Sequence, residues 1–233
     1  MRQKQAFFTV LNGRVKFNRG DYNVTGDAVF LAASVRIKMQ NHDPESEFSV
    51  LDAGIGTGGA ALCLLARVPC AKVTGIDISE TMLDEAAANA KLNDREIELI
   101  HGDILNWKTD RTFDVVMTNP PYFKGTPRKG NEKFIHHNVN LNDWVRACLR
   151  RVRPHGYFYC ITDAATSSEI TAALVAGRAG DIEVIPLFSK IGKDKVAERS
   201  IVRARTGTNG GTKIWPGLFM DNEKILTKMG AIL

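Results

Sequence analysis

The feature that most constrains the fold of this chain is a glycine-rich turn between an apolar strand and a helix, Asp52 to Gly59. Within it, Gly54, Gly56 and Gly59 fit the spacing GxGxxG, which is typical of a turn that holds a nucleotide. Glycine has no Cβ atom, so the backbone can turn sharply and approach a ligand closely. The same spacing also fits a tight turn without a ligand, so the neighbouring elements must decide between the two interpretations.

From Phe48 onward, short apolar runs alternate with segments of helical spacing. This alternation predicts an α/β fold, a doubly wound and mostly parallel sheet with helices on both faces. Ligands of such sheets bind beyond the C-terminal ends of the strands, where we expect Gly54, Asp77, Asp103 and Asn119. Seven strands are expected at 50–52, 72–76, 97–100, 113–117, 157–161, 182–187 and 200–204, and helices at 58–67, 79–90, 141–152, 167–176 and 221–229.

Residues 1–47 are expected to form a small N-terminal extension that packs on a main domain at 48–233. Alternating apolar and polar residues over 13–25, with a possible turn at Arg19 to Asp21, predict a short hairpin. Apolar residues at helical spacing predict a helix over 27–38. The polar run that follows this helix would be the joint between the two parts.

Composition narrows the cellular context. The 233 residues suffice for one domain with a full core. The longest uncharged run, Ala53 to Ala66, is too short and too glycine-rich to cross a bilayer, and the N-terminus shows no secretory signal. The four cysteines form no CxxC pair, which predicts free thiols in a reducing compartment. We therefore expect a cytoplasmic protein with no membrane association and no metal.

Positive charge is concentrated in two blocks of the sequence. Residues 123–155 carry eight Lys or Arg and two acids, and residues 188–213 carry seven Lys or Arg and two acids. Such a concentration beside a ligand-binding edge suits a polyanionic substrate such as a nucleic acid. A solvated face is the simpler interpretation, and charge alone does not choose between them.

The run Asn119-Pro120-Pro121-Tyr122 closes the apolar strand that begins at Phe113. The two prolines fix the backbone, and Pro120 biases Asn119 away from helical geometry. The Asn119 amide oxygen and the Pro120 carbonyl would then be two rigid acceptors, and Tyr122 would offer a stacking face. Two acceptors can hold both protons of an amino group, so that its lone pair is free to attack an electrophilic methyl group. Catalysis would come from positioning and from preorganised dipoles.

The strand that follows the glycine turn ends at Asp77, whose carboxylate can accept hydrogen bonds from both hydroxyls of a ribose. Asp103 ends the next predicted strand and could face an adenine ring. Both acids indicate a nucleoside cofactor. NAD and S-adenosylmethionine fit them equally well.

The glycine turn and the Asn119–Tyr122 run together resemble those of the class I S-adenosylmethionine-dependent N-methyltransferases. Within this class, most of the chain resembles the bacterial valine-tRNA adenine-N6 methyltransferase family. The resemblance implies a Rossmann-like fold, S-adenosylmethionine as cofactor, tRNA as partner, and methyl transfer to N6 of an adenine beside the anticodon. It implies catalytic roles for Asn119, Pro120 and Tyr122. The cofactor contacts that we expect are Asp27, Asp52, Gly54, Gly56, Gly58, Asp77, Ile78, Asp103, Ile104 and Asn119.

Arg146, Arg150 and Arg153 recur on one face of the helix predicted over 141–152, opposite its apolar residues. Basic side chains of this kind hold the phosphates of a nucleic acid without reading its bases. The expected RNA contacts are Lys124, Arg128, Lys129, Lys133, His136, His137, Arg146 and Arg150.

Several alternatives stay open at this point. The acceptor pair does not distinguish an adenine from the side-chain amide of a glutamine, so a protein-glutamine, rRNA or DNA N-methyltransferase is possible. An RNA-binding protein without activity is another alternative. An NAD-binding Rossmann protein would leave Asn119–Tyr122 unexplained. The oligomeric state is open between a monomer and a weak dimer.

Overall fold

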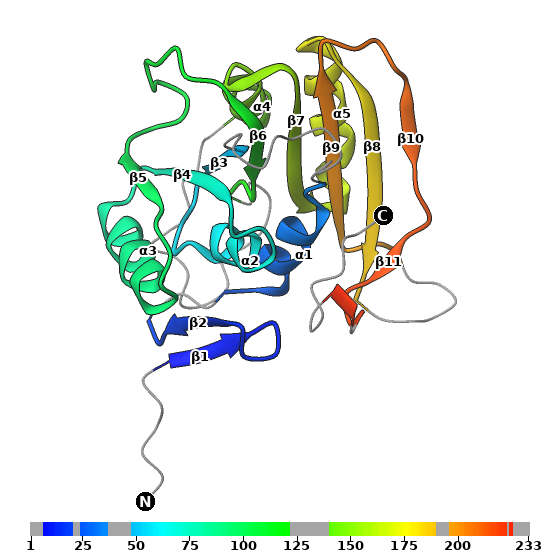
Figure 1. Cartoon of the computed structure of the whole chain (residues 1–233). Coiled ribbons are helices and arrows are strands. Elements are labelled where there is room, and N and C mark those ends of the chain that lie inside the picture. Colours follow the sequence, from blue (N-terminus) through cyan, green and yellow to red (C-terminus); the bar gives the residue numbers. More distant parts are fainter. Residues whose placement is uncertain are drawn as a thin grey trace, which may run out of the picture.

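The computed structural model describes residues 7–20, 24–36, 48–121, 140–189, 196–222 and 224–225. Its central feature is a β-sheet with helices on both faces (Figure 1). The strands of this sheet are β3 (Phe48–Ala53), β4 (Ala71–Asp77), β5 (Glu98–His101), β6 (Phe113–Thr118), β7 (Val152–Asp163), β8 (Ala179–Phe188), β9 (Arg199–Thr206), β10 (Thr212–Ile214) and β11 (Leu218–Phe219). The helices are α1 (Gly26–Ser34), α2 (Gly59–Arg67), α3 (Glu80–Leu92), α4 (Leu141–Leu149) and α5 (Ser167–Ala176), with a short 3-10 helix at Ala164–Thr166.

The seven expected strands are all present, in the spatial order β8-β9-β7-β6-β3-β4-β5. Strand β9 runs antiparallel to β7 and β8, and the pairs from β7 to β5 are parallel. The predicted fold class is therefore confirmed. The short strands β10 and β11 both pair with β8 and bring the described sheet to nine strands. They have three and two residues, which is too few for an alternating pattern to reveal.

The two faces of the sheet are covered by different helices. One face packs against α1, α2 and α3, and their apolar residues join Val50, Val115 and Tyr159 in one core. The other face packs against α4 and α5, whose apolar residues surround Leu51 and Phe158. Because β3 is buried on both faces, its consecutive residues Val50 and Leu51 are both apolar and enter different cores, as in a central parallel strand.

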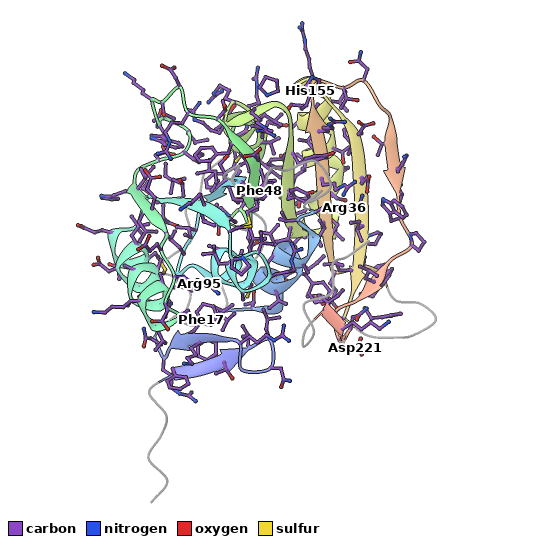
Figure 2. The ribbon with its side chains drawn as sticks, in the orientation of Figure 1. Phe17, Arg36, Phe48, Arg95, His155 and Asp221 are labelled. Atoms are coloured by element: carbon purple, nitrogen blue, oxygen red, sulfur yellow. The ribbon has the colours of Figure 1, made fainter. Side chains whose placement is uncertain are left out.

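Strand β3 lies between β4 and β6, with all three parallel. In the register of the ladder, Ala53 is the partner of Ile76 on one side and of Thr118 on the other. The segments that follow these three strands therefore leave the sheet at the same edge. Figure 2 shows the two edges of the sheet by two labelled residues. Asp221, which follows β11, lies at one end of the molecule, and His155 lies at the other end.

The glycine turn is held in the expected strand-to-helix position. Gly54, Gly56 and Gly58 all have positive φ angles, of 75°, 54° and 85°, which side chains with a Cβ atom rarely adopt. The backbone N–H groups of Gly54 and Ile55 both donate to Ile76 O, at 2.9 and 3.1 Å. These bonds tie the turn to the neighbouring strand β4.

The predicted N-terminal hairpin exists, but its predicted position was wrong. It pairs β1 (Phe7–Val10) with β2 (Val15–Asn18) around a turn that contains Asn12 and Gly13. Both turn residues have positive φ angles, and Asn-Gly is a strong turn signal that outweighs the run at Arg19. Phe17 of β2 is buried where the hairpin meets α3 (Figure 2).

Other boundaries also differ from prediction. Helix α1 spans Gly26–Ser34 rather than 27–38, and Val35 is already extended. Helix α4 ends at Leu149 because Val152 pairs with Phe113 and begins β7. The domain border between residues 47 and 48 stays a prediction, since residues 37–47 lie outside the described part. Most of the helix predicted over 221–229 lies outside it too.

Two expectations from composition can be compared with the described residues. Cys63, Cys148 and Cys160 are buried free thiols, and Cys70 is exposed. None of the helices that the structure describes is both long and apolar enough to cross a membrane.

Replacing Gly75 of β4 tests the packing under the glycine turn. A Cβ atom at this position would lie 2.2 Å from Ile55 Cδ1, so the Ile55 side chain must move. We expect Gly75→Ala to lower the free energy of unfolding by roughly 1–3 kcal/mol, measured by urea denaturation.

Gly211→Ala is the matched control, because a Cβ atom there meets no atom within 4 Å. Its free energy of unfolding should stay within about 0.5 kcal/mol of the unsubstituted protein. Equal stability of the two variants would contradict this packing.

Candidate active site

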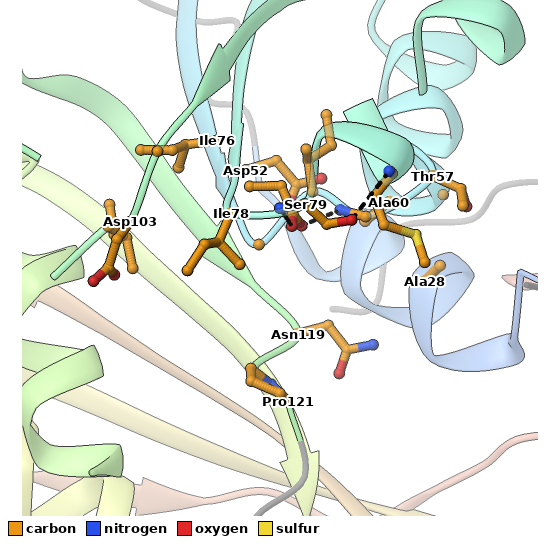
Figure 3. Close-up of a pocket in the computed structure, with 18 of the residues that line it drawn as sticks. Ala28, Asp52, Thr57, Ala60, Ile76, Ile78, Ser79, Asp103, Asn119 and Pro121 are labelled. Carbon is orange, nitrogen blue, oxygen red and sulfur yellow. Dashed lines mark hydrogen bonds between the residues drawn. The ribbon is translucent and has the colours of Figure 1, made fainter. Parts of the chain in front are cut away.

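A cavity of about 550 Å³ opens at the C-terminal edge of the parallel strands. Its volume is that of a typical small-molecule site. Figure 3 shows its walls, with Asn119 and Pro121 after β6 and the glycine-turn residues after β3. The lining residues are Val24, Thr25, Ala28, Asp52, Gly54, Ile55, Gly56, Thr57, Gly59, Ala60, Ile76, Asp77, Ile78, Ser79, Thr81, Met82, Gly102, Asp103, Ile104, Leu105, Asn119, Pro121 and Trp144.

The carboxylate of Asp77 is fixed by backbone amides at the end of β4. Its Oδ2 accepts from Gly56 N and its Oδ1 from Ser79 N, both at 2.9 Å. A carboxylate has about four lone-pair positions, so two hydrogen bonds leave capacity for a ligand. The same bonds that orient Asp77 also join the glycine turn to the first turn of α3, where the Ser79 side chain caps the helix.

Asp52 places a buried carboxyl group at the cavity. Its side chain is 2% exposed, and its Oδ2 has no hydrogen-bond partner among the described residues. Burial raises the pKa of Asp52 to about 7, a hydrogen bond from the Ala61 backbone opposes the rise, and the charge of Asp77 adds to it. Burying a carboxylate without a positive charge beside it costs free energy, so Asp52 favours a cationic ligand atom next to its Oδ2.

Apolar and polar residues after β4 and β5 form another wall. Ile78 is 48% exposed, which is unusual for a large apolar side chain, while Ile104 is almost fully buried. Asp103 is held by its own turn, since its Oδ1 accepts from Leu105 N at 2.9 Å and its Oδ2 from Asn106 Nδ2 at 2.7 Å. This wall offers flat apolar contact with hydrogen-bonding groups beside it, which suits a planar ring.

The expected catalytic run begins at the cavity. Asn119 and Pro121 line it, while Pro120 between them is buried and does not. Tyr122 lies outside the described residues. The indole of Trp144, on α4, lies against the same end of β6 and donates to Thr118 Oγ1 at 3.0 Å.

Eight of the ten predicted cofactor residues line the cavity, and Asp27 and Gly58 do not. Asp27 instead pairs with Arg199, with 3.1 Å between Oδ2 and Nε. Arg199 also pairs with Asp163, so Asp27 joins α1 to β9 and to the end of β7. Gly58 is the left-handed N-cap of α2, and its neighbours Thr57 and Gly59 line the cavity in its place.

The predicted RNA contacts are only partly within the described residues. Arg146 and Arg150 are exposed on α4 and at its C-cap, and Arg150 is six residues beyond Trp144, or about 9 Å along the helix axis. Arg153, the third member of the predicted stripe, pairs with Asp114 at 2.6 Å near the start of β6, at the edge opposite the cavity. The stripe therefore leads away from the cavity. Lys124, Arg128, Lys129, Lys133, His136 and His137 lie outside the described residues.

Three described arginines of the second basic block contact other groups within the molecule. Arg199 binds two carboxylates, Arg203 pairs with the buried Glu183, and Arg205 lies over the ring of Tyr157. In the part of the chain that the structure describes, these three arginines stabilise the antiparallel strands β7, β8 and β9.

Several residues of the cavity were not predicted from the sequence, among them Thr81 and Met82 in the first turn of α3. Val24, Thr25 and Ala28 flank Asp27, which the family resemblance marked as a cofactor contact. These neighbours line the cavity, and Asp27 itself does not.

No prediction was made for Trp144. It follows Leu141 at a spacing of three residues on α4, so helical periodicity would place it on the inner face of the helix. That signal indicates burial and gives no reason to choose the cavity.

Comparisons with known proteins agree with this geometry. A family model described as a methyltransferase domain matches residues 50–156. Over 120 residues the chain is 31% identical to a tRNA1(Val) (adenine(37)-N6)-methyltransferase from Glaesserella parasuis, covering 49% of this chain and 51% of that protein. Over 91 residues it is 37% identical to a release factor glutamine methyltransferase from Flavobacterium psychrophilum, covering 39% and 30%. The chain thus spans about half or less of the length of these relatives.

The fold extends the likeness beyond the matched sequence. A predicted O-methyltransferase from Agrobacterium tumefaciens has a crystal structure that superposes with a TM-score of 0.66 at 25% identity, covering 84% of this chain and 88% of that one. The fold is that of the class I S-adenosylmethionine-dependent methyltransferases. The resemblance to the tRNA1(Val) adenine-N6 enzymes that the sequence motifs indicate is confirmed at the level of sequence similarity.

The pKa of Asp52 gives a prediction for stability. This pKa is about 7 in the folded protein and near 3.8 in an unfolded chain, so between these values the folded state binds more protons. The contribution of Asp52 to the free energy of unfolding therefore falls as pH rises from about 4 to about 7. Asp52→Asn removes this loss, and we expect it to stabilise the ligand-free protein at pH 8 by an amount on the order of a few kcal/mol.

Urea denaturation of both proteins from pH 5 to pH 8 measures the effect. The stability difference in favour of Asp52→Asn should grow with pH. A difference that stays constant over this range would show that Asp52 does not titrate there.

Proposed function

We propose that this protein is an S-adenosylmethionine-dependent N-methyltransferase that modifies the exocyclic N6 of an adenine in tRNA. The observation that carries the proposal is that Asn119 lines the same cavity as the glycine turn and Asp77. A nucleoside site alone would fit many enzymes. A nucleoside site that shares its cavity with the Asn-Pro-Pro run fits transfer of a methyl group to nitrogen.

The described residues fit S-adenosylmethionine on four counts. The unpartnered Oδ2 of Asp52 suits a cationic group of the cofactor, because a positive charge would offset its burial. A Cβ atom at Gly56 would meet no protein atom within 4 Å, so the turn leaves room for a ligand against its backbone. Asp77 retains acceptor capacity for ribose hydroxyls. Ile78 and Ile104 would hold the adenine ring.

When bound, the cofactor supplies an electrophilic methyl group. The protein's part is to present the acceptor nitrogen. The Asn119 amide oxygen, in the cavity wall, would accept one N–H of the target amino group, and the Pro120 carbonyl, which is outside the described cavity lining, would accept the other. Together they would draw the lone pair of the nitrogen out of conjugation and aim it. A neutral amine needs no strong base before attack. As the nitrogen–methyl bond forms, the methyl–sulfur bond would break with its electron pair left on sulfur, and the nitrogen would then lose its extra proton to water. Rate enhancement comes from orientation and fixed dipoles. The rigid backbone at Pro120 and Pro121 keeps the two acceptors in place.

The choice of tRNA over a protein rests on two observations. The relatives include tRNA adenine-N6 enzymes that match up to about half of their own length, whereas the release factor enzyme from Flavobacterium psychrophilum is matched over 30% of its length. The sequence also places Lys124, Arg128, Lys129 and Lys133 directly after Tyr122, where a phosphate backbone would enter. An adenine in a single-stranded loop could leave its stack at low cost to reach Asn119.

Asn119→Ala tests the catalytic role. Loss of one of two acceptors should lower kcat for methyl transfer by about 100-fold or more, because preorganised hydrogen bonds of this kind contribute that much. The dissociation constant for S-adenosylmethionine, measured by calorimetry, should change far less than kcat, because the other predicted cofactor residues of the cavity are intact. Asn142→Ala, on the exposed side of α4, is the control and should keep full turnover. Undiminished kcat in Asn119→Ala would refute the mechanism.

Substrate class is tested with radiolabelled S-adenosylmethionine. Total tRNA from a strain that lacks this gene, rRNA, and a release factor are offered separately, and labelled tRNA is digested to nucleosides. We expect label in N6-methyladenosine from tRNA, with tRNA affinity falling steeply between 50 and 200 mM salt, a range over which phosphate contacts weaken markedly. Label on a glutamine of the release factor, with tRNA unlabelled, would replace the tRNA proposal by the protein-glutamine alternative.

A further inference from the structure

We propose that Trp144 and Thr118 form a positioning pair that fixes Asn119 relative to the glycine turn. This inference deepens the proposed function and rests on the catalytic role of Asn119. Neither residue is expected to act on the substrate. Their contribution is to set where the acceptor group of Asn119 lies.

The pair is built from buried polar atoms at the edge of the cavity. Thr118 is fully buried, and Trp144 is 8% exposed. The indole Nε1 donates to Thr118 Oγ1 at 3.0 Å, and this hydroxyl donates in turn to Ala53 O at 2.8 Å. One hydroxyl therefore joins the last residues of β3 and β6 to the first turns of α4.

Ala53 and Thr118 are each next to a functional segment in the sequence. Ala53 directly precedes Gly54 of the glycine turn, and Thr118 directly precedes Asn119. A chain of two hydrogen bonds thus links the residue before each functional segment. The backbone ladder also pairs Ala53 with Thr118, but both strands end there, and the ladder does not reach α4.

The ring of Trp144 fixes the same geometry from the other side. A Cβ atom at Gly54 would lie 3.3 Å from Trp144 Cζ2, so the indole is packed closely against the start of the turn. Trp144 also lines the cavity beside Asn119. Its side chain therefore contacts the glycine turn, bonds the strand before Asn119, and holds α4 against both.

A purely structural role is the competing explanation, because a buried indole hydrogen bond stabilises a fold wherever it lies. Trp215 provides the comparison within the same chain. Its Nε1 donates to Glu183 Oε2 at 2.7 Å, in the β8 region and away from the cavity. Loss of that bond should affect stability without affecting Asn119.

The experiment compares four single variants and one double variant by stability, S-adenosylmethionine affinity and kcat. Thr118→Val removes the hydroxyl at nearly constant shape and should lower kcat about 10- to 100-fold, since a small misplacement of a reacting group has effects of this size. Thr118→Ser restores the hydroxyl and should recover most of that loss. Trp144→Phe should lower kcat comparably, and adding it to Thr118→Val should cause little further loss, because both break one linkage. Trp215→Phe should keep full kcat.

A positioning role predicts that kcat falls while the affinity for S-adenosylmethionine stays the same. In Thr118→Val the dissociation constant for S-adenosylmethionine should stay near that of the unsubstituted protein, since Thr118 does not line the cavity. Full kcat in Thr118→Val would overturn the proposal. The proposal would also be overturned if Trp215→Phe lost as much kcat as Thr118→Val when the two variants have equal thermal stability.

A second measurement does not depend on turnover. The side-chain amide of Asn119 gives a pair of ¹H–¹⁵N NMR signals, assigned by their absence in Asn119→Ala. These signals should shift in Thr118→Val and in Trp144→Phe, and stay in place in Trp215→Phe. Unmoved signals in the first two variants would overturn the positioning role. If the unsubstituted protein methylates neither RNA nor a glutamine, the proposed function fails, and this NMR comparison still decides whether the pair positions Asn119.

Discussion

The parallel pairing of β3 with β4 on one side and β6 on the other is the constraint on which the site depends. Parallel strands must enter the sheet from the same edge, so the segments that follow them leave it together. The register aligns Ala53 with Ile76 and with Thr118, and the residues after these partners converge. The glycine turn, Asp77 and Asn119 thereby share one cavity although 65 residues separate Asp52 from Met117, its partner in β6.

This arrangement concentrates unusual polar groups where the backbone is held most firmly. Asp52 is a buried carboxyl group with a pKa raised to about 7 and one oxygen without a described partner. Asp77 is oriented by two backbone amides, and Thr118 is locked between Ala53 and Trp144. Burying the Asp52 carboxyl group costs folding free energy, and Asp77 and Thr118 are each held by two hydrogen bonds, which is more than packing alone requires. Together they describe a rigid cavity that is complementary to a ligand with a positive charge and a nucleoside.

Much of the fold and part of the site follow from local sequence signals, for identifiable physical reasons. The glycine turn, Asp77 and Asn119 each end an apolar run, and parallel topology brings such ends to one edge. The cavity wall formed by Val24 and Ala28 depends on how α1 packs, which no local pattern encodes. The hairpin was misplaced because two turn signals lie close together, and the left-handed Asn12-Gly13 turn decides between them. The predicted stripe of arginines follows a helical face only as far as Arg150, because Arg153 lies in β7 and pairs with Asp114 of the neighbouring strand β6.

The most direct test of this account is calorimetric titration of S-adenosylmethionine in buffers with different ionisation enthalpies at pH 7. Asp52 is partly protonated at this pH, and a bound cationic group would lower its pKa. We expect binding at one site per chain with release of up to about half a proton, a release that disappears in Asp52→Asn. NAD should give no heat of binding. Tight binding of NAD, or S-adenosylmethionine binding whose heat is the same in every buffer, would contradict it.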